Sequence, residues 1–290
     1  MKKVLALAIL FGALTLNAQD KKEEPKEGWK KSGNISFLFN QSAFNNWLAG
    51  GTNNISGTLG LNYDFNYVKG DWTWDNKIIA SYGITKLKGE DMQKTDDRFE
   101  FNSLAGKKAS ENWYYSAFFN FKTQMSSTDV NGVQQSHFFS PAYFQFGPGM
   151  LWKKNDNLKV NIAPATSKLI VVHDEFTAQD TPQAIESFNA AGGYFGVEAN
   201  ETLRYELGAA VSAYYKFTLM ENVSVENILN LYSNYLEDPQ NVDLDYTVNV
   251  VMKINKYLSA NLALQAIYDD NAFKGFQTRE VFGLGVNYGF

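Results

Sequence analysis

The residues that suggest chemistry in this 290-residue chain are few: it has two histidines, His137 and His173, and no cysteine. The lack of cysteine excludes a disulfide framework, a thiolate metal site and a cysteine nucleophile. Nucleophilic hydrolysis needs a serine beside a histidine, and the candidate pair is His137 and Ser140. Three residues along a strand place two side chains on opposite faces, so this pair needs a bend. His173 stands beside Asp174 and Glu175, which we interpret as a solvated surface cluster. We therefore predict no catalytic residue and no metal site.

Two pairs of adjacent carboxylates, Asp96-Asp97 and Asp269-Asp270, are the other groups whose spacing suggests chemistry. Acid–base catalysis needs such groups to act at one point. Neighbouring residues of a strand face opposite sides of the sheet, so neither pair converges. We interpret all four as solvated charges at strand ends. The sequence has no calcium loop of the D-x-D-x-D-G type, and we predict no cofactor.

The elements that must position these residues alternate with a period of two from residue 33 onward. Within 55–68, for example, Ile55 and Leu59 fall on one side and Ser56 and Thr58 on the other, which is typical of a strand. The same alternation predicts about twelve strands, roughly at 33–44, 53–68, 72–86, 97–108, 113–125, 139–152, 158–173, 197–219, 223–236, 243–254, 258–269 and 278–290.

The links between these strands alternate in length. They are short at 69–71, 109–112, 153–157, 220–222 and 255–257, and mostly longer at 45–52, 87–96, 126–138, 174–196, 237–242 and 270–277. An even strand number with short turns at one end is typical of an outer-membrane barrel. We predict an all-β fold, an antiparallel transmembrane β-barrel with short periplasmic turns and longer extracellular loops. The competing interpretation is a soluble β-sandwich or lipocalin-like barrel, whose strands are usually only about 5–6 residues long.

The aromatic residues favour the membrane barrel over the soluble alternatives. The chain has 22 Phe, 16 Tyr and 6 Trp, and many outward rings gather next to the short turns, where a headgroup girdle is expected. In a soluble protein they would form a large exposed apolar patch. The mean hydropathy of −0.32 excludes several helical spans. The rings near the turns are Tyr67, Trp72, Trp74, Trp113, Tyr115, Trp152, Phe217 and Tyr257.

The opposite faces of the strands carry charges of both signs, which we predict line the lumen. Ion pairing across the barrel would satisfy such charges, which are costly when buried alone. The alternative is a charged constriction that selects solutes. By alternation the lumen receives Asp64, Asp75, Lys77, Arg98, Glu100, Lys122, Arg204, Glu206, Glu226, Asp245, Lys253, Asp269 and Arg279.

The longest loop, 174–196, contains a helix signature. Thr181 is suited to cap it, Pro182 to its first turn and Gly192 to its end. The helix is either a plug folded into the lumen or a structured external loop, and the sequence leaves both open.

The N-terminal segment 1–18 is predicted to be a cleaved signal peptide. Lys2 and Lys3 precede an apolar run that is too short to span a bilayer, and Ala18 offers a small residue for cleavage. Residues 19–32 are expected to form a flexible charged periplasmic leader, followed by the barrel at 33–290. Export and the net charge of −5 argue against nucleic acid as a partner.

Several motifs resemble one known family. The run from Trp47 through Gly50, Gly51 and Asn53 to Asn54 resembles a W-x-x-G-G-x-N-x signature, and further matches occur at 94–97, 106–108, 113–116, 139–143 and 163–168. The family is catalogued as a domain of unknown function, number 3078. The resemblance implies an exported outer-membrane barrel of Gram-negative-type bacteria with no established activity, and it carries over no catalytic residue. Gly50-Gly51 indicates a tight loop, with Trp47 as an interfacial anchor or an inward lid.

Three function classes follow. The first is a narrow channel for small solutes, with loop 174–196 as a candidate constriction, because twelve strands lie between the filled eight-stranded and the open sixteen-stranded barrels. The second is a non-conducting structural or partner-binding envelope barrel. The third is an outer-membrane lipid hydrolase or acyltransferase. Besides lipid, we expect the outer-membrane assembly machinery as a partner, because the alternating aromatics that end at Phe290 resemble its recognition signal. The sequence does not set the oligomeric state.

Overall fold

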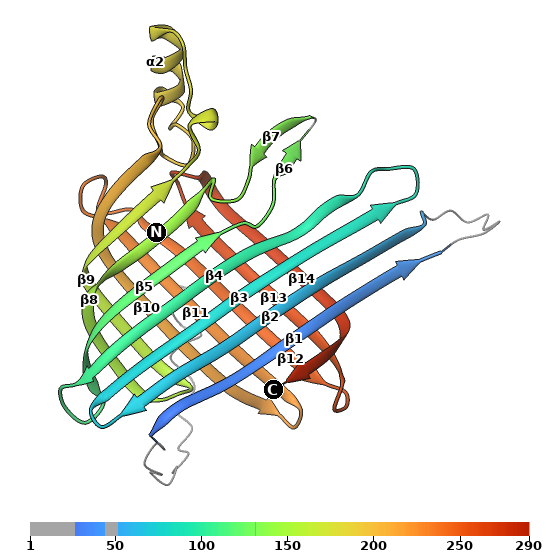
Figure 1. The fold of residues 1–290 in the computed structure, drawn as a ribbon, viewed down its shortest axis with the longest axis vertical. Coiled ribbons are helices and arrows are strands. Elements are labelled where there is room, and N and C mark those ends of the chain that lie inside the picture. Colours follow the sequence, from blue (N-terminus) through green and yellow to red (C-terminus); the bar gives the residue numbers. More distant parts are fainter. Residues whose placement is uncertain (1–26, 44–51, 131, 290) are drawn as a thin grey trace.

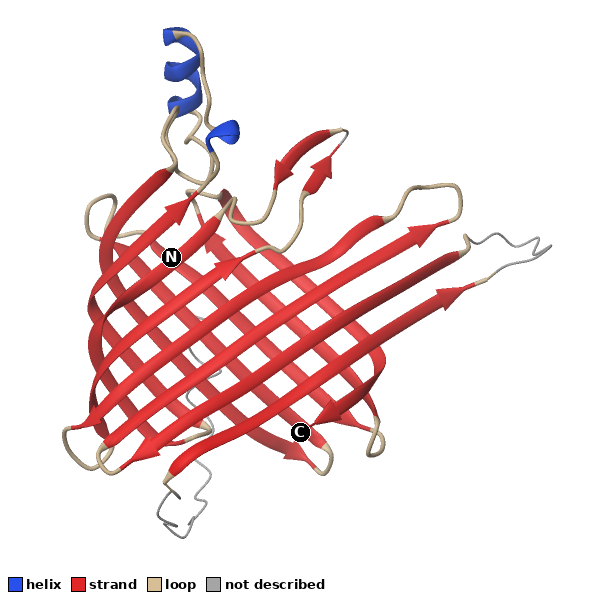
Figure 2. Cartoon of the chain, viewed as in Figure 1, coloured by secondary structure: helices blue, strands red, loops and turns tan. Residues whose placement is uncertain are grey.

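The computed structural model describes residues 27–43, 52–130 and 132–289. Twelve antiparallel strands close into one barrel, as predicted (Figures 1 and 2). None of the helices in this part of the chain is long and apolar enough to cross a membrane. The barrel strands are β1 (Gly28–Ser42), β2 (Asn54–Lys69), β3 (Trp72–Leu87), β4 (Gln93–Lys108), β5 (Trp113–Thr123), β8 (Ala142–Asn155), β9 (Leu158–Val171), β10 (Leu203–Met220), β11 (Val223–Asn234), β12 (Val242–Lys253), β13 (Leu258–Asp269) and β14 (Phe273–Gly289).

The long loops and the short turns lie at opposite ends of the barrel (Figure 2). The long-loop end carries a small hairpin of β6 (Thr128–Val130) and β7 (Val133–Ser136), which the alternation did not predict. It also carries the short helix η2 (Asp174–Phe176) and the helix α2 (Pro182–Ala190). The helix prediction is confirmed, because the Thr181 hydroxyl accepts from the backbone N–H of Ala184 at 3.2 Å.

The first strand starts earlier than expected. Strand β1 begins at Gly28, inside the segment predicted as leader, because β2 continues to Lys69 and gives it a partner. Trp29 pairs with Tyr67, and the Trp29 ring lies 5.1 Å from the Tyr67 ring and 5.8 Å from the Trp74 ring. Aromatic contacts of this kind favour continued strand pairing. Residues 1–26, with the predicted signal peptide and most of the leader, lie outside the described residues.

The seam that closes the barrel is short. β1 pairs with β2 over its whole length, but with β14 only over Asn34–Leu38 and Gly285–Gly289. Leu38 packs where Gly283 and Gly285 leave room for it. This seam is the one pairing of the barrel that joins the two ends of the chain.

The outer face of the barrel is apolar. Near the short turns it exposes large rings, among them Trp72 and Tyr257, and Trp113 pairs with Trp152. Further along, the exposed fractions are 56% for Leu59 and 62% for Phe282. An apolar outer band with an aromatic girdle at its edge matches the surface that lipid requires.

A β-bulge in β9 changes which residues face inward. Gly208 pairs with Thr166, whereas Ala210 pairs with Ala163, so β9 carries one extra residue around Pro164. Proline within a strand is typical of bulges, since it donates no ladder hydrogen bond. Two lysines of opposite parity on this strand, Lys159 and Lys168, therefore both reach the lumen.

Candidate functional site: the charged lumen

One ion pair crosses the full width of the barrel. The Lys77 Nζ on β3 lies 3.0 Å from the Glu226 Oε1 on β11, and these strands are separated by five others on either side of the ring. Glu226 also accepts from the Tyr214 hydroxyl at 2.8 Å and from the Asn249 amide at 3.0 Å. Asp64 completes the group, 3.7 Å from Lys77. Contacts between strands that are not neighbours pass through the interior, so this pair spans the lumen.

A second group lies on the side of the long loops. Lys122 on β5 contacts Asp245 on β12 at 2.8 Å and Glu100 at 3.7 Å. The guanidinium of Arg98 donates two hydrogen bonds to Glu100, at 2.8 and 2.9 Å. This bidentate geometry fixes both side chains.

Another cation–anion contact joins β14 to β4. The Arg279 Nη2 lies 2.6 Å from the Asp96 Oδ2. Asp96 and Asp97 face opposite sides, as expected, but they are not solvated rim charges. Asp97 accepts from the backbone N–H groups of Met125 and Ser126 at 2.7 and 3.0 Å, because the chain after β5 folds over this end of β4. Both carboxylates therefore have structural partners.

Lys168 is the centre of a third group. Its Nζ lies 3.0 Å from Asp243, 3.3 Å from Glu206 and 3.8 Å from Asp269. It also lies 4.9 Å from the centroid of the Tyr232 ring, where a cation is attracted by the ring face. One ammonium group thus holds carboxylates from three strands.

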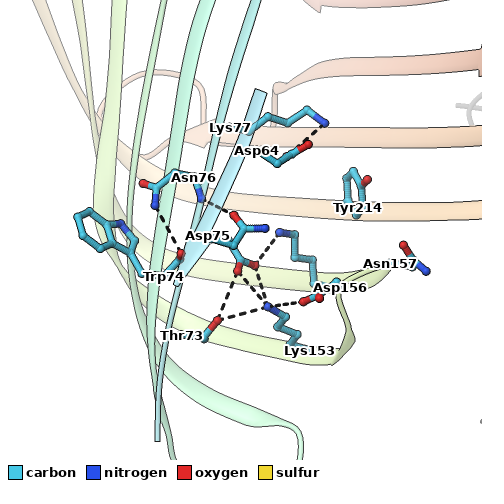
Figure 3. A network of polar contacts seen from close by, with 12 residues as sticks. Asp64, Thr73, Trp74, Asp75, Asn76, Lys77, Lys153, Asp156, Asn157 and Tyr214 are labelled. Atoms are coloured by element: carbon cyan, nitrogen blue, oxygen red, sulfur yellow. Dashed lines mark hydrogen bonds and ion pairs between the residues drawn. The ribbon is translucent and has the colours of Figure 1, made fainter. Parts of the chain in front are cut away.

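The fourth group lies near the short turns (Figure 3). Asp75 is held by Lys153 at 3.0 Å and by Lys159 at 2.8 Å, and Lys153 also contacts Asp156 at 3.1 Å. Thr73 lies within 3.4 Å of the same carboxylate. Two cations on one buried carboxylate lock β3 to β8 and β9 across the interior.

The structure brings twelve of the thirteen predicted lumen residues into ion pairs. The remaining one, Lys253, is exposed at the end of β12. Sequence reasoning missed six charged members of these groups, namely Asp96, Lys153, Asp156, Lys159, Lys168 and Asp243. For the two lysines on β9, the sequence does contain a signal. Pro164 marks a bulge, and beyond the bulge the alternation of inward and outward residues is shifted by one position.

Small cavities remain between the charged groups. One of about 250 Å³ is lined by Lys122, Lys168 and Asp245, together with Phe195 from the long loop. This space admits several water molecules. Another cavity, of about 410 Å³, is lined by Arg98 and other charged residues.

The loop predicted as plug or external structure divides into two parts. Helix α2 projects away from the barrel (Figure 1), whereas Phe195 at the base of the loop lines the cavity. Tyr194 beside it donates to the Gln135 carbonyl at 2.7 Å. Burial, and secondarily the Glu175 carboxylate, raises the pKa of the Tyr194 hydroxyl to about 12, so it remains a donor at neutral pH.

His137 and Ser140 do not form a nucleophile–base pair. Ser140 is fully buried, and its hydroxyl accepts from the backbone N–H of His173 at 2.6 Å. The His137 ring instead contacts Phe138 and Glu175. A hydrolase would need the imidazole against the serine oxygen. The bend that a direct pair would need is present, but it turns the two side chains toward different partners.

Among the motif residues, Trp47, Gly50 and Gly51 lie outside the described residues, as does Phe290. The Asn53 carbonyl accepts from the backbone N–H of Lys88 at 2.9 Å, which joins the first two long loops.

A family model supports the resemblance suggested by these motifs. The model described as a protein of unknown function, DUF3078, matches residues 39–128. This segment contains the motifs at 47–54, 94–97, 106–108 and 113–116, whereas those at 139–143 and 163–168 lie beyond it. No curated protein matches the chain.

Three solved structures show a limited similarity to this chain. An outer membrane channel from Pseudomonas putida F1 has a TM-score of 0.41 at 10% identity, with 94% of this chain and 98% of that chain covered. The translocator domain of the autotransporter NalP from Neisseria meningitidis has a TM-score of 0.34 at 9% identity, with coverage of 100% and 98%. The outer membrane channel DcaP of Acinetobacter baumannii has a TM-score of 0.30 at 11% identity, with coverage of 91% and 96%. The architecture of this chain is established by its own strand pairing.

Proposed function

We propose that the protein is an outer-membrane barrel that provides a narrow passage for small polar solutes, constricted by ion pairs across its lumen. The apolar outer face with its ring of Trp and Tyr supports the membrane location. The predicted signal peptide, the charged leader and the assembly signal at Phe290 remain part of this proposal.

The observation that carries the proposal is the Lys77–Glu226 pair at 3.0 Å. A contact between side chains of opposite walls leaves no wide pore at that level. The two cavities toward the long loops are lined by charged side chains together with polar, aromatic and aliphatic ones. A charged, water-accessible constriction selects solutes by size and charge. Phe195 adds a second narrowing at the level of the long loops.

Conductance of the refolded protein in planar bilayers tests this function. We expect small discrete steps for the wild type and larger steps for the double variant Lys77→Ala/Glu226→Ala, which removes the pair without changing net charge. The matched control is Glu221→Ala/Lys256→Ala, which removes one charge of each sign from exposed positions in the short turns. Equal steps in all three proteins would contradict a constriction at Lys77.

A second function is favoured by the projecting parts. Helix α2 and the β6–β7 hairpin stand out from the barrel (Figure 1), and such projections are suited to contact another envelope component. If neither the folded wild-type barrel nor the Lys77→Ala/Glu226→Ala variant conducts, the channel is rejected and a partner-binding barrel is supported.

A further inference from the structure

The only two histidines of the chain meet at the end of the barrel that carries the long loops. His137 follows β7 and His173 follows β9, yet their ring centroids lie 5.2 Å apart. Glu175 on η2 lies between them: its Oε1 is 2.8 Å from the His137 Nε2 and 3.8 Å from the His173 Nδ1, which also contacts the Asp174 Oδ1 at 2.9 Å. One nitrogen of each ring and one Glu175 oxygen lie within 4.8 Å of one another.

The His137 ring is oriented as a metal ligand requires. Its Nδ1 lies 2.6 Å from the Phe138 carbonyl oxygen, which can only accept, so Nδ1 carries the hydrogen. The His137 Nε2 lies 2.8 Å from the Glu175 Oε1, a hydrogen-bond distance, so a metal ion bound at this point takes the place of the proton between the two atoms. Metal-binding histidines characteristically donate their second N–H to a carbonyl or carboxylate in this way, which fixes the tautomer.

The backbone around the three groups is tightly held. His137 and Ser140 exchange two backbone hydrogen bonds, at 3.1 and 2.9 Å, and the buried Ser140 hydroxyl fixes the N–H of His173. The Phe176 ring packs against His137 at 5.2 Å and stacks on Tyr194 at 4.8 Å. These contacts connect two separate loops, so the ligands are positioned before an ion arrives.

We propose that His137, His173 and Glu175 form a binding site for a divalent transition-metal ion, with Zn²⁺ as the best match. Two imidazoles and one carboxylate are a donor set that Zn²⁺ accepts, and a fourth position is left for water. The side chains are 24%, 57% and 50% exposed, respectively, so an ion can enter from solvent. Such an ion would tie the two longest described loops together above the lumen.

Calorimetric titration of the refolded, EDTA-treated barrel with ZnCl₂ tests the site. We expect one Zn²⁺ per chain, and a loss of affinity of about tenfold or more for His137→Ala, His173→Ala or Glu175→Gln. The double variant His137→Ala/His173→Ala, which has no histidine, should lose the site. The matched control is Glu186→Gln, which removes an exposed carboxylate of α2 in the same loop and should bind normally.

Heat-modifiable migration shows whether each variant folds. If a variant does not fold, a chemical protection experiment on the wild-type protein still tests the site. Zn²⁺ should protect both histidines from diethyl pyrocarbonate, as followed by mass spectrometry of the intact barrel. Absence of stoichiometric binding, retention of binding by the folded double variant, or equal modification with and without Zn²⁺ would each overturn the proposal.

Discussion

Replacing Lys168 by Met should destabilise the barrel more than any substitution of an exposed lysine. The Lys168 side chain is 5% exposed and contacts Glu206, Asp243 and Asp269. Methionine keeps most of the volume and the contact with the Tyr232 ring, but it removes the charge. The effect therefore reports the loss of one cation from a buried ionic group.

The expected magnitude follows from the partners left behind. Removing one member of a buried ion pair costs about 3–5 kcal/mol. Glu206 is 1% exposed but keeps Arg204 at 2.9 Å, whereas Asp243 and Asp269 are 20% and 17% exposed and can draw water from the neighbouring cavity. Both features reduce the penalty, so we expect the lower end of the range, about 3 kcal/mol. This is a roughly hundredfold fall in the folded-to-unfolded ratio.

The assay is urea unfolding of the refolded barrel in lipid vesicles, followed by tryptophan fluorescence. Lys256→Met, at an exposed position, should change the free energy of unfolding by no more than about 0.5 kcal/mol. The double variant Lys168→Met/Asp243→Asn should recover part of the loss, because it removes one of the unpaired carboxylates. A Lys168→Met protein as stable as Lys256→Met would refute the assignment of Lys168 to a buried ionic centre.

Three further outcomes are expected. Tyr232→Phe should leave the free energy of unfolding unchanged or raise it by up to about 1 kcal/mol, because the Tyr232 hydroxyl is buried without a hydrogen-bond partner among the described residues; a loss above that size would show a missing partner. Gly208→Ala should strongly reduce the refolding yield, since an added Cβ would overlap the Ser233 carbonyl oxygen. A Cβ at Gly57 would instead meet its nearest neighbour, the Phe37 ring, at 3.4 Å, so Gly57→Ala should refold. Deletion of Phe290 should lower barrel assembly in cells; unchanged membrane yield and unchanged heat-modifiable migration would count against the assembly signal.

The strands were predictable because alternation is a local property. A barrel wall separates lipid from a polar interior, so every second residue is apolar, and the periodicity locates β2, β3 and β13 to within a residue or two. The helix α2 was equally visible, since Thr181, Pro182 and Gly192 act over a few residues. The early start of β1 was missed because its partner residues on β2, not its own composition, extend the strand.

The interior partners were not predictable to the same degree. Alternation predicts whether a residue faces the lumen. It does not predict the position of the residue along the barrel axis or which residue faces it from the opposite side. Lys77 could therefore be placed inside, but Glu226 could not be named as its partner. The bulge at Pro164 shifts the alternation along β9, and Lys168, which was not among the predicted lumen residues, faces the lumen. His137 and His173 lie 36 positions apart on separate loops, and only the fold of those loops brings them to 5.2 Å.

The short seam between β1 and β14 has a consequence for folding kinetics. Its partners, Asn34–Leu38 and Gly285–Gly289, are separated by about 250 residues of chain, the largest separation of any strand pair in the barrel. Hairpins between neighbouring strands close short loops and lose little conformational entropy. The β1–β14 pairing closes a loop of about 250 residues and therefore has the largest loop-closure entropy in the barrel. We therefore expect seam closure to be the slow step of folding and, because few residues hold it, the first event of unfolding.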